Sequence, residues 1–223
     1  MSKLFNSIIS ALAIVACAGC DINIHVGQGP SIKGSGNVVT ESREVSPFSA
    51  LDLKGSMDVE VTRGDAFKCT LRGDDNILPL ITTEISGQRL CVSAKQNYST
   101  RQRLVVLLEA PELTDVLLSG SGNISLADVT RDTFALKISG SGNVVGKGTT
   151  KQMTVEVNGS GNLKLGELAA DRVEVTLNGS GNAEISAKLS LTAKVNGSGN
   201  ITYSGNPEKV QTDVSGSGHI SKN

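Results

Sequence analysis

The chain has 223 residues, enough for one large or two small domains, and its formal net charge is −1. That balance offers no basic face to nucleic acid, so we expect no nucleic-acid partner. With 25 Gly, no Trp and 3% aromatic residues, the composition is unlike that of a compact α/β enzyme.

Residues 1–16 have the organisation of a lipoprotein signal peptide. Lys3 supplies a weak positive charge, and residues 8–16 are apolar over a length too short to span a bilayer. Residues 14–17 look like a bacterial lipobox, so the predicted lipidation site is Cys17, with Cys20 as the second choice. The alternative is an ordinary cleaved signal with incidental cysteines. We expect a membrane attachment through the N-terminal lipid, at the outer rather than the inner membrane.

Residues 17–43 predict a tether, because Gly27, Gly29 and Pro30 interrupt any regular pattern. Two further cysteines, Cys69 and Cys91, could pair in an oxidising compartment. Strand alternation places their side chains on opposite faces, which favours a buried thiol at Cys69 instead.

Residues 44–110 keep the alternation of β-strands without the glycine-rich motif described next. Residues 55–61 look like a degenerate copy of that motif, and residues 77–81 are apolar and irregular. We predict either the first coils of a solenoid or an N-terminal β-module that caps it, because an uncovered solenoid end is a bare sheet edge.

Residues 111–223 are dominated by a repeat. From Gly120 onward, successive motifs are 20, 19, 20, 18 and 19 residues apart, and the sequence between them alternates apolar and polar residues. A flexible linker would lack that alternation, so the repeat predicts an all-β fold: a β-solenoid with coils of about 19 residues, stacked in parallel between equivalent residues. Gly-Ser-Gly-Asn begins at Gly34, Gly120, Gly140, Gly159, Gly179 and Gly197, and Gly-Ser-Gly-His begins at Gly216.

The alternation continues through the motif. It places Gly159 and Gly161 on the inward face and Asn158, Ser160 and Asn162 on the outward face. Glycine would then let the wall bend sharply or approach the opposite wall, although a turn with a left-handed glycine is the alternative. In either case the Ser and Asn side chains stack from coil to coil and can form ladders. The predicted ladder residues are Ser121, Asn123, Ser141, Asn143, Ser160, Asn162, Ser180, Asn182, Ser198 and Asn200.

These ladders have a structural and a functional interpretation. They can simply hold the coils together, which we favour, or they can present a polar surface to a periodic ligand such as a glycan. Sugar faces usually stack on aromatic rings, and only Tyr98 and Tyr203 are available.

Catalytic and metal chemistry lack the residues they need. The chain has two histidines, His25 and His219, and the motif carries neutral Asn where calcium-binding repeats carry Asp, so we expect no metal and no cofactor. Glu156 and Glu174 occupy similar positions of successive coils, with Lys194 stacking beyond them, and are expected to be solvated. The chain is therefore not expected to be an enzyme.

The sequence resembles the head GIN domain family of auto-transporter adhesins over about residues 36–222. The matching stretches are Gly36-Asn37-Val38-Val39, residues 43–53, residues 55–61 and the Gly-Ser-Gly-Asn repeats. The resemblance implies a right-handed parallel β-helix in an envelope protein and carries no catalytic residues. His219, in place of the last Asn, is the one departure.

The expected function is that of a non-enzymatic, lipid-anchored cell-envelope protein. It would act as an adhesin or as a structural or protein-interaction scaffold, and the alternative is a carbohydrate-binding module that uses the Asn and Ser ladders. The expected partners are envelope proteins or glycans, and the solenoid ends could pair into a homo-oligomer.

Overall fold

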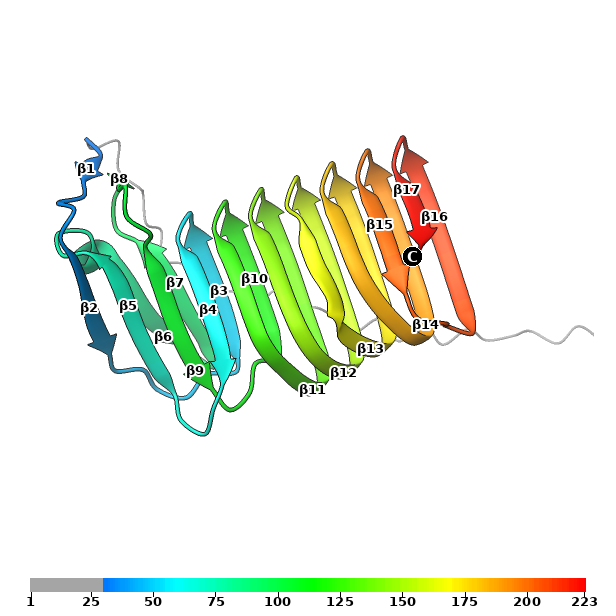
Figure 1. The fold of residues 1–223 in the computed structure, drawn as a ribbon, viewed down its shortest axis with the longest axis horizontal. Helices are drawn as coiled ribbons and strands as arrows, with labels where there is room; N and C mark the ends of the chain where they lie inside the picture. Colours follow the sequence, from blue (N-terminus) through cyan, green and yellow to red (C-terminus); the bar gives the residue numbers. More distant parts are fainter. Residues whose placement is uncertain (1–29) are drawn as a thin grey trace, which may run out of the picture.

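The computed structural model describes residues 30–223, and these form a long stack of parallel β-coils (Figure 1). The prediction of a β-solenoid is confirmed. The eight strands of the repeat region are β10 (Asp115–Gly120), β11 (Asn123–Gly140), β12 (Asn143–Gly159), β13 (Leu163–Gly179), β14 (Asn182–Gly197), β15 (Asn200–Ser204), β16 (Lys209–Gly216) and β17 (His219–Lys222).

Equivalent residues of successive coils pair in parallel, as the repeat predicts. Ile138 pairs with Val157, Val157 with Leu177 and Leu177 with Val195, and all four are at most 1% exposed. Such apolar columns run along the solenoid axis between two walls. In each coil, the strand that ends at the motif belongs to the first wall. The strand that begins at or just after the motif Asn belongs to the second wall. The core is therefore a continuous apolar layer whose burial stabilises each coil against its neighbours.

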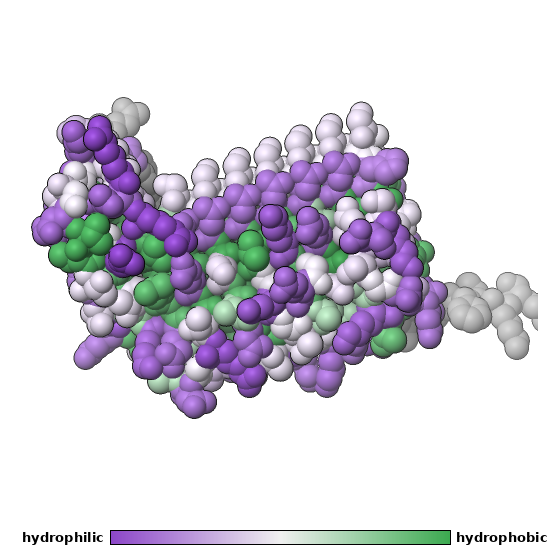
Figure 2. All heavy atoms as spheres, in the orientation of Figure 1, coloured by the Kyte–Doolittle hydropathy of each residue, from purple (hydrophilic) through white to green (hydrophobic). Residues whose placement is uncertain are grey.

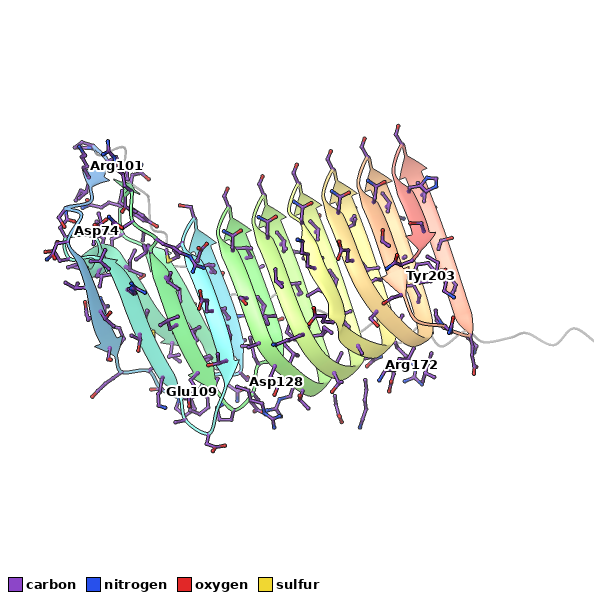
Figure 3. All side chains as sticks on the ribbon, in the orientation of Figure 1. Asp74, Arg101, Glu109, Asp128, Arg172 and Tyr203 are labelled. Carbon is purple, nitrogen blue, oxygen red and sulfur yellow. The ribbon has the colours of Figure 1, made fainter. Side chains whose placement is uncertain are left out.

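Each coil has two unlike corners. The Gly-Ser-Gly corner keeps its register throughout, whereas the opposite corner contains bulges, for example between Leu126 and Val129 and between Leu165 and Ala169. The variation in repeat length is absorbed at this bulged corner, because a bulge accommodates extra residues without disturbing the strands on either side. Figure 3 labels Asp128 and Arg172 on this side of the coils.

The solenoid extends into the N-terminal half, but not in chain order. Strands β3 (Ala50–Gly55) and β4 (Asp58–Arg63) form a coil that stacks on β10 and β11, with Gly55 in register with Gly120. On the far side of β3 and β4 lie β7 (Arg89–Ala94) and β9 (Val105–Ala110), again in parallel. The degenerate motif at residues 55–61 thus occupies a true corner of the solenoid.

Antiparallel strands end the stack on the N-terminal side. Strand β5 (Lys68–Asp74) lies between β9 and β2 (Val38–Arg43), and β6 (Ile81–Ser86) pairs with β7, all antiparallel. A short 3-10 helix, η1 (Leu78–Leu80), precedes β6. A second small sheet pairs β1 (Ile32–Lys33) with β8 (Tyr98–Ser99). Leu71, Ile77, Leu78 and Ile81 are at most 1% exposed, so this end buries its apolar residues.

Within the segment assigned above to the tether, residues 32–33 and 38–43 form β1 and β2 instead. Hydrogen bonds hold this segment in place. In the first motif copy, Ser35 Oγ and Asn37 Nδ2 donate to the Asp75 carboxylate at 2.5 and 2.8 Å. This copy, which begins at Gly34, is therefore not a solenoid corner. The signal peptide, Cys17 and Cys20 lie outside the described residues.

Candidate functional site

The Gly-Ser-Gly-Asn corner has the same geometry in every coil of the repeat. The strand ends at the first glycine, whose φ lies between +129° and +140° at the six copies from Gly120 to Gly216. The serine stands at the tip, the second glycine points inward, and the next strand begins at or just after the Asn. The corner combines the two alternatives given above. The second glycine faces inward, as the strand alternation predicts, and the first glycine has a positive φ, as a turn requires.

Both glycines are required because successive coils approach closely at this corner. A Cβ on the first glycine would lie 2.1–2.3 Å from the carbonyl oxygen of the first glycine of the preceding coil. A Cβ on Gly142, Gly161 or Gly181 would likewise lie 2.1–2.4 Å from the second glycine's oxygen in the preceding coil. The contact that excludes a side chain is thus with the preceding coil, and not with the opposite wall as the sequence suggested.

The predicted asparagine ladder is present. Each motif Asn after Asn123 donates its Nδ2 to the Oδ1 of the motif Asn in the preceding coil, at 2.9–3.1 Å. His219 takes the place of Asn in the last coil and pairs in register with Asn200. The ladder contains Asn123, Asn143, Asn162, Asn182 and Asn200.

A second ladder runs beside the first, on the residue that precedes each motif. Asn196 donates to Asn178 at 2.7 Å, and Asn178 donates to Asn158 at 2.8 Å. The candidate residues did not include this column. Its signal in the sequence is the recurrence of Asn or Ser immediately before the first glycine.

Both ladders end on a carboxylate that is paired with a cation. Asn123 donates to Asp58 Oδ1 at 2.8 Å, and Arg103 Nε donates to Asp58 Oδ2 at 2.7 Å. In the second ladder, Asn158 donates to Glu156 Oε1 at 2.7 Å. The hydrogen bond from Asn158, together with Lys137 Nζ at 3.0 Å, lowers the pKa of Glu156. In both ladders each Asn–Asn bond is therefore donated toward the preceding coil, and the first asparagine donates to a carboxylate: Asn123 to Asp58 in the β4 coil, and Asn158 to Glu156 on its own strand.

The predicted serines are arranged differently from the asparagines. Their backbone N–H groups donate to the first-glycine oxygen of the preceding coil, at 3.0 Å for Ser141 and 2.9 Å for Ser198. Within residues 30–223 their hydroxyls make no hydrogen bond, so the serines form a row of free, exposed donors and acceptors (Figure 2). We name this row the serine ridge; it consists of Ser121, Ser141, Ser160, Ser180 and Ser198.

Glu156 and Glu174 do not share a row, contrary to the expectation from sequence. Glu156 pairs in register with Thr176, and Glu174 pairs with Thr154, because Glu174 lies two residues further from its motif. Lys194 forms its ion pair with Asp213 at 3.4 Å rather than with either glutamate. Glu156 and Lys194 therefore belong to two separate ion pairs on the outer face of the first wall, with Lys137 and with Asp213.

An open groove of about 610 Å³ lies at the bulged corner, on the opposite side of the coils from the serine ridge. Threonine hydroxyls and charged side chains line it, including Thr130, Thr149 and Lys188. One of its lysines, Lys151, is paired with Asp132 at 2.9 Å. Such a groove can hold a small polar ligand, but none of the predicted ladder residues contributes to it.

Cys69 is a free, buried thiol, so Cys69 and Cys91 do not pair with each other. Burial raises the pKa of the Cys69 thiol to about 11. In residues 30–223, no group of three His, Cys, Asp or Glu side chains is placed to hold a metal ion. The same part of the chain contains no helix long and apolar enough to cross a membrane.

Solved structures of similar fold come from species of Bacteroides and Parabacteroides. An adhesin described as putative from Bacteroides fragilis superposes with a TM-score of 0.72 at 23% identity, covering 86% of this chain and 100% of that one. A "putative lipid binding protein" from Parabacteroides distasonis gives a TM-score of 0.58 at 24% identity, with 87% and 100% covered. A putative adhesin from Parabacteroides merdae gives 0.57 at 20% identity, again with 87% and 100% covered. These likenesses show the shared fold.

No curated protein matches the chain. A family model described as "Putative auto-transporter adhesin, head GIN domain" matches residues 47–207. Those residues contain β3 and β4, the antiparallel strands β5 and β6, and most of the repeat coils with their serine ridge and asparagine ladders. The chain therefore belongs to the head GIN domain family of auto-transporter adhesins.

Proposed function

We propose that this protein is a non-enzymatic adhesion or scaffold protein of the cell envelope that contacts its partner through the serine ridge. The observation that carries the proposal is the row of exposed hydroxyls that have no hydrogen-bond partner within the described chain. Each hydroxyl is mounted on a backbone whose N–H is already bonded to the preceding coil. A partner would therefore lose little chain entropy in binding the ridge, because the ridge is already ordered.

The spacing of the ridge also supports contact with an extended partner. Parallel coils repeat about every 4.8 Å, so five serines form a line of roughly 19 Å. The neighbouring asparagine ladders are satisfied among themselves, which leaves the serines as the groups most available to a partner. Membership of an adhesin-head family agrees with such a contact role.

The proposal includes an N-terminal lipid anchor at Cys17, with Cys20 as the second choice, and an outer-membrane location. Mass spectrometry of the mature N-terminus tests the anchor directly. An acylated peptide that begins at Cys17 or Cys20 supports it, and an unmodified N-terminus at another residue contradicts it.

The adhesion role is tested with a triple variant in which Ser141, Ser160 and Ser180 become Ala. No hydroxyl hydrogen bond is lost inside the protein, so the thermal unfolding temperature should stay unchanged. Attachment of cells that carry the variant should fall, as should capture of envelope proteins by the purified chain. The matched control replaces Thr154, Thr176 and Thr192 on the first wall by Val. Equal attachment by wild type and ridge variant would refute the proposal.

A second candidate function is carbohydrate binding by the same ridge. Its support is the line of hydroxyls, which could replace water around a repeating polar ligand. Its weakness is the shortage of aromatic platforms noted above. A glycan array distinguishes the two functions, because the carbohydrate hypothesis requires at least one glycan whose binding the triple serine variant abolishes.

A further inference from the structure

The C-terminal end of the solenoid differs from the N-terminal end in having no covering strands among the described residues. All eight residues of β16 are exposed. Val210 and Val214 lie in register with Leu191 and Val195, which are 1% and 0% exposed, yet they are themselves 46% and 43% exposed. Among residues 30–223, the apolar rows therefore reach this end with no strand beyond them, and Figure 1 shows β16 and β17 as the last strands of the stack. We name the outward side of β16 the open edge.

The open edge also presents backbone groups that have no partner within residues 30–223. Ala135 N–H donates to Thr114 O in the preceding coil, and the register carries Ala135 through Thr154, Glu174 and Thr192 to Gln211. Because hydrogen-bonding direction alternates along a strand, Gln211 and Asp213 bond to β14. The N–H and C=O groups of Val210, Thr212 and Val214 then point away from the solenoid.

Such an edge is a template for another strand, and the fold restricts which strand can be added. Parallel head-to-tail stacking of two copies would require a parallel edge at the N-terminal end. In the wall that contains β16, that end finishes in β6, which runs antiparallel to β7. Two open edges can instead meet symmetrically, and a two-fold axis between two equivalent strands makes them antiparallel.

The sequence of β16 is complementary to itself in that arrangement. With Thr212 on the axis, Val210 lies opposite Val214 of the second copy, and both valines face the core side. On the outer side, Lys209 is a diagonal neighbour of Asp213 of the second copy, within reach of a long side chain. Like charges do not oppose one another.

We propose that the open edge is a homodimer interface, in which β16 pairs antiparallel with β16 of a second copy about a two-fold axis at Thr212. The axis of an antiparallel pair is perpendicular to the sheet. Each serine ridge therefore points away from the other, and the dimer offers two binding edges on opposite sides. Contacts cover only one strand per copy, so the dimer is expected to be reversible.

Cysteine cross-linking in the full-length chain tests the register. The variant Thr212→Cys places the two thiols across the axis, where paired Cα atoms lie about 5.5 Å apart, a separation that a disulfide can bridge. Under mild oxidation most of this variant should migrate at twice the monomer mass on non-reducing gels. The wild-type chain controls for the native cysteines, and Lys164→Cys, an exposed position on β13, controls for random collision.

A second variant tests the pairing itself. Thr212→Pro removes an N–H that points outward and leaves the bonds to β14 intact, so folding should persist. In sedimentation velocity at increasing concentration, wild type should shift toward the dimer mass and Thr212→Pro should not. Three results would overturn the proposal: monomers at every concentration, no more cross-linking of Thr212→Cys than of Lys164→Cys, or a disulfide from position 212 to Cys17 or Cys20 of the same chain. The last would show that the chain's own N-terminal segment covers the edge.

Discussion

Asn123 donates its side-chain amide to Asp58, and this bond joins a ladder made of repeats to a coil that lacks the full motif. The two residues are 65 positions apart in the chain, and their Nδ2 and Oδ1 atoms lie 2.8 Å apart. Four further asparagines donate in the same direction behind Asn123. A carboxylate can only accept, so Asp58 sets the orientation of every amide behind it.

Replacing Asp58 by Ala should destabilise the protein by about 2 kcal/mol, because both Asn123 and Arg103 lose a charge-assisted partner. Urea unfolding measures the change. The control is Asp132→Ala, which removes an ion pair with Lys151 whose side chains are 77% and 67% exposed. Exposed pairs contribute roughly 0–1 kcal/mol. Equal effects of the two substitutions would show that Asp58 does not terminate a ladder.

The direction of the second ladder predicts an unusual pH response of Asn178→Asp. The introduced carboxyl can accept from Asn196 in either ionisation state, but it can donate to Asn158 only when protonated. Its folded-state pKa should therefore rise above its unfolded value. The variant should be closest to wild-type stability at low pH and should lose stability as pH increases through that range. A pH series of unfolding free energies that shows no such loss would contradict the assigned direction.

Gly161→Ala should be strongly destabilising, because the new Cβ would lie 2.4 Å from the Gly142 carbonyl oxygen. Overpacking of this kind costs about 1–3 kcal/mol, and more where backbone must move. Gly166, five residues further on in β13, is the matched control, since an added Cβ there meets nothing within 4 Å. Gly166→Ala should be neutral or slightly stabilising, because alanine lowers the entropy of the unfolded chain. Comparable thermal unfolding of the two variants would refute the close-approach explanation.

The solenoid could be predicted because its signal is redundant. Alternating apolar residues and a motif every 18 to 20 residues both require coils that stack in register, and residues such as Val157 and Leu177 pair as expected. The asparagine ladder followed from that register. The reason for glycine did not, because a sequence does not report how closely Gly161 approaches the carbonyl of Gly142.

Long-range topology was the part that sequence could not supply. After β4 the chain forms β5 to β9 on one side of the coil made by β3 and β4, and then returns at β10, which pairs with β3 on the other side. Nothing local to Gly55 indicates that its neighbour is Gly120. The ion pair of Glu156 with Lys137 was also missed: Lys194 lies in the same row as Glu156, but Thr176 stands between them, whereas Lys137 is in the adjacent coil.

Glu156 should make stability depend on acid pH. The hydrogen bond from Asn158 and the charge of Lys137 lower its pKa in the folded protein. Its contribution is therefore fully present above the unfolded-state pKa of a glutamate and is lost as pH falls through the folded-state pKa. Glu156→Gln keeps an acceptor for Asn158 and removes the titration. The stability difference between wild type and this variant should shrink on acidification; a constant difference from pH 6 to pH 3 would contradict the assignment.

Cys69 should be unreactive in the folded protein. It is 2% exposed, and burial raises the pKa of its thiol to about 11, so little thiolate forms near neutral pH. Alkylation by iodoacetamide at pH 8, followed by peptide mapping, should leave Cys69 unmodified in native buffer. The same treatment in guanidinium chloride should modify it fully, which shows that the thiol was shielded and not oxidised. Rapid labelling in native buffer would mean that β5 opens readily from its place between β2 and β9, and that the antiparallel end is less stable than the solenoid it covers.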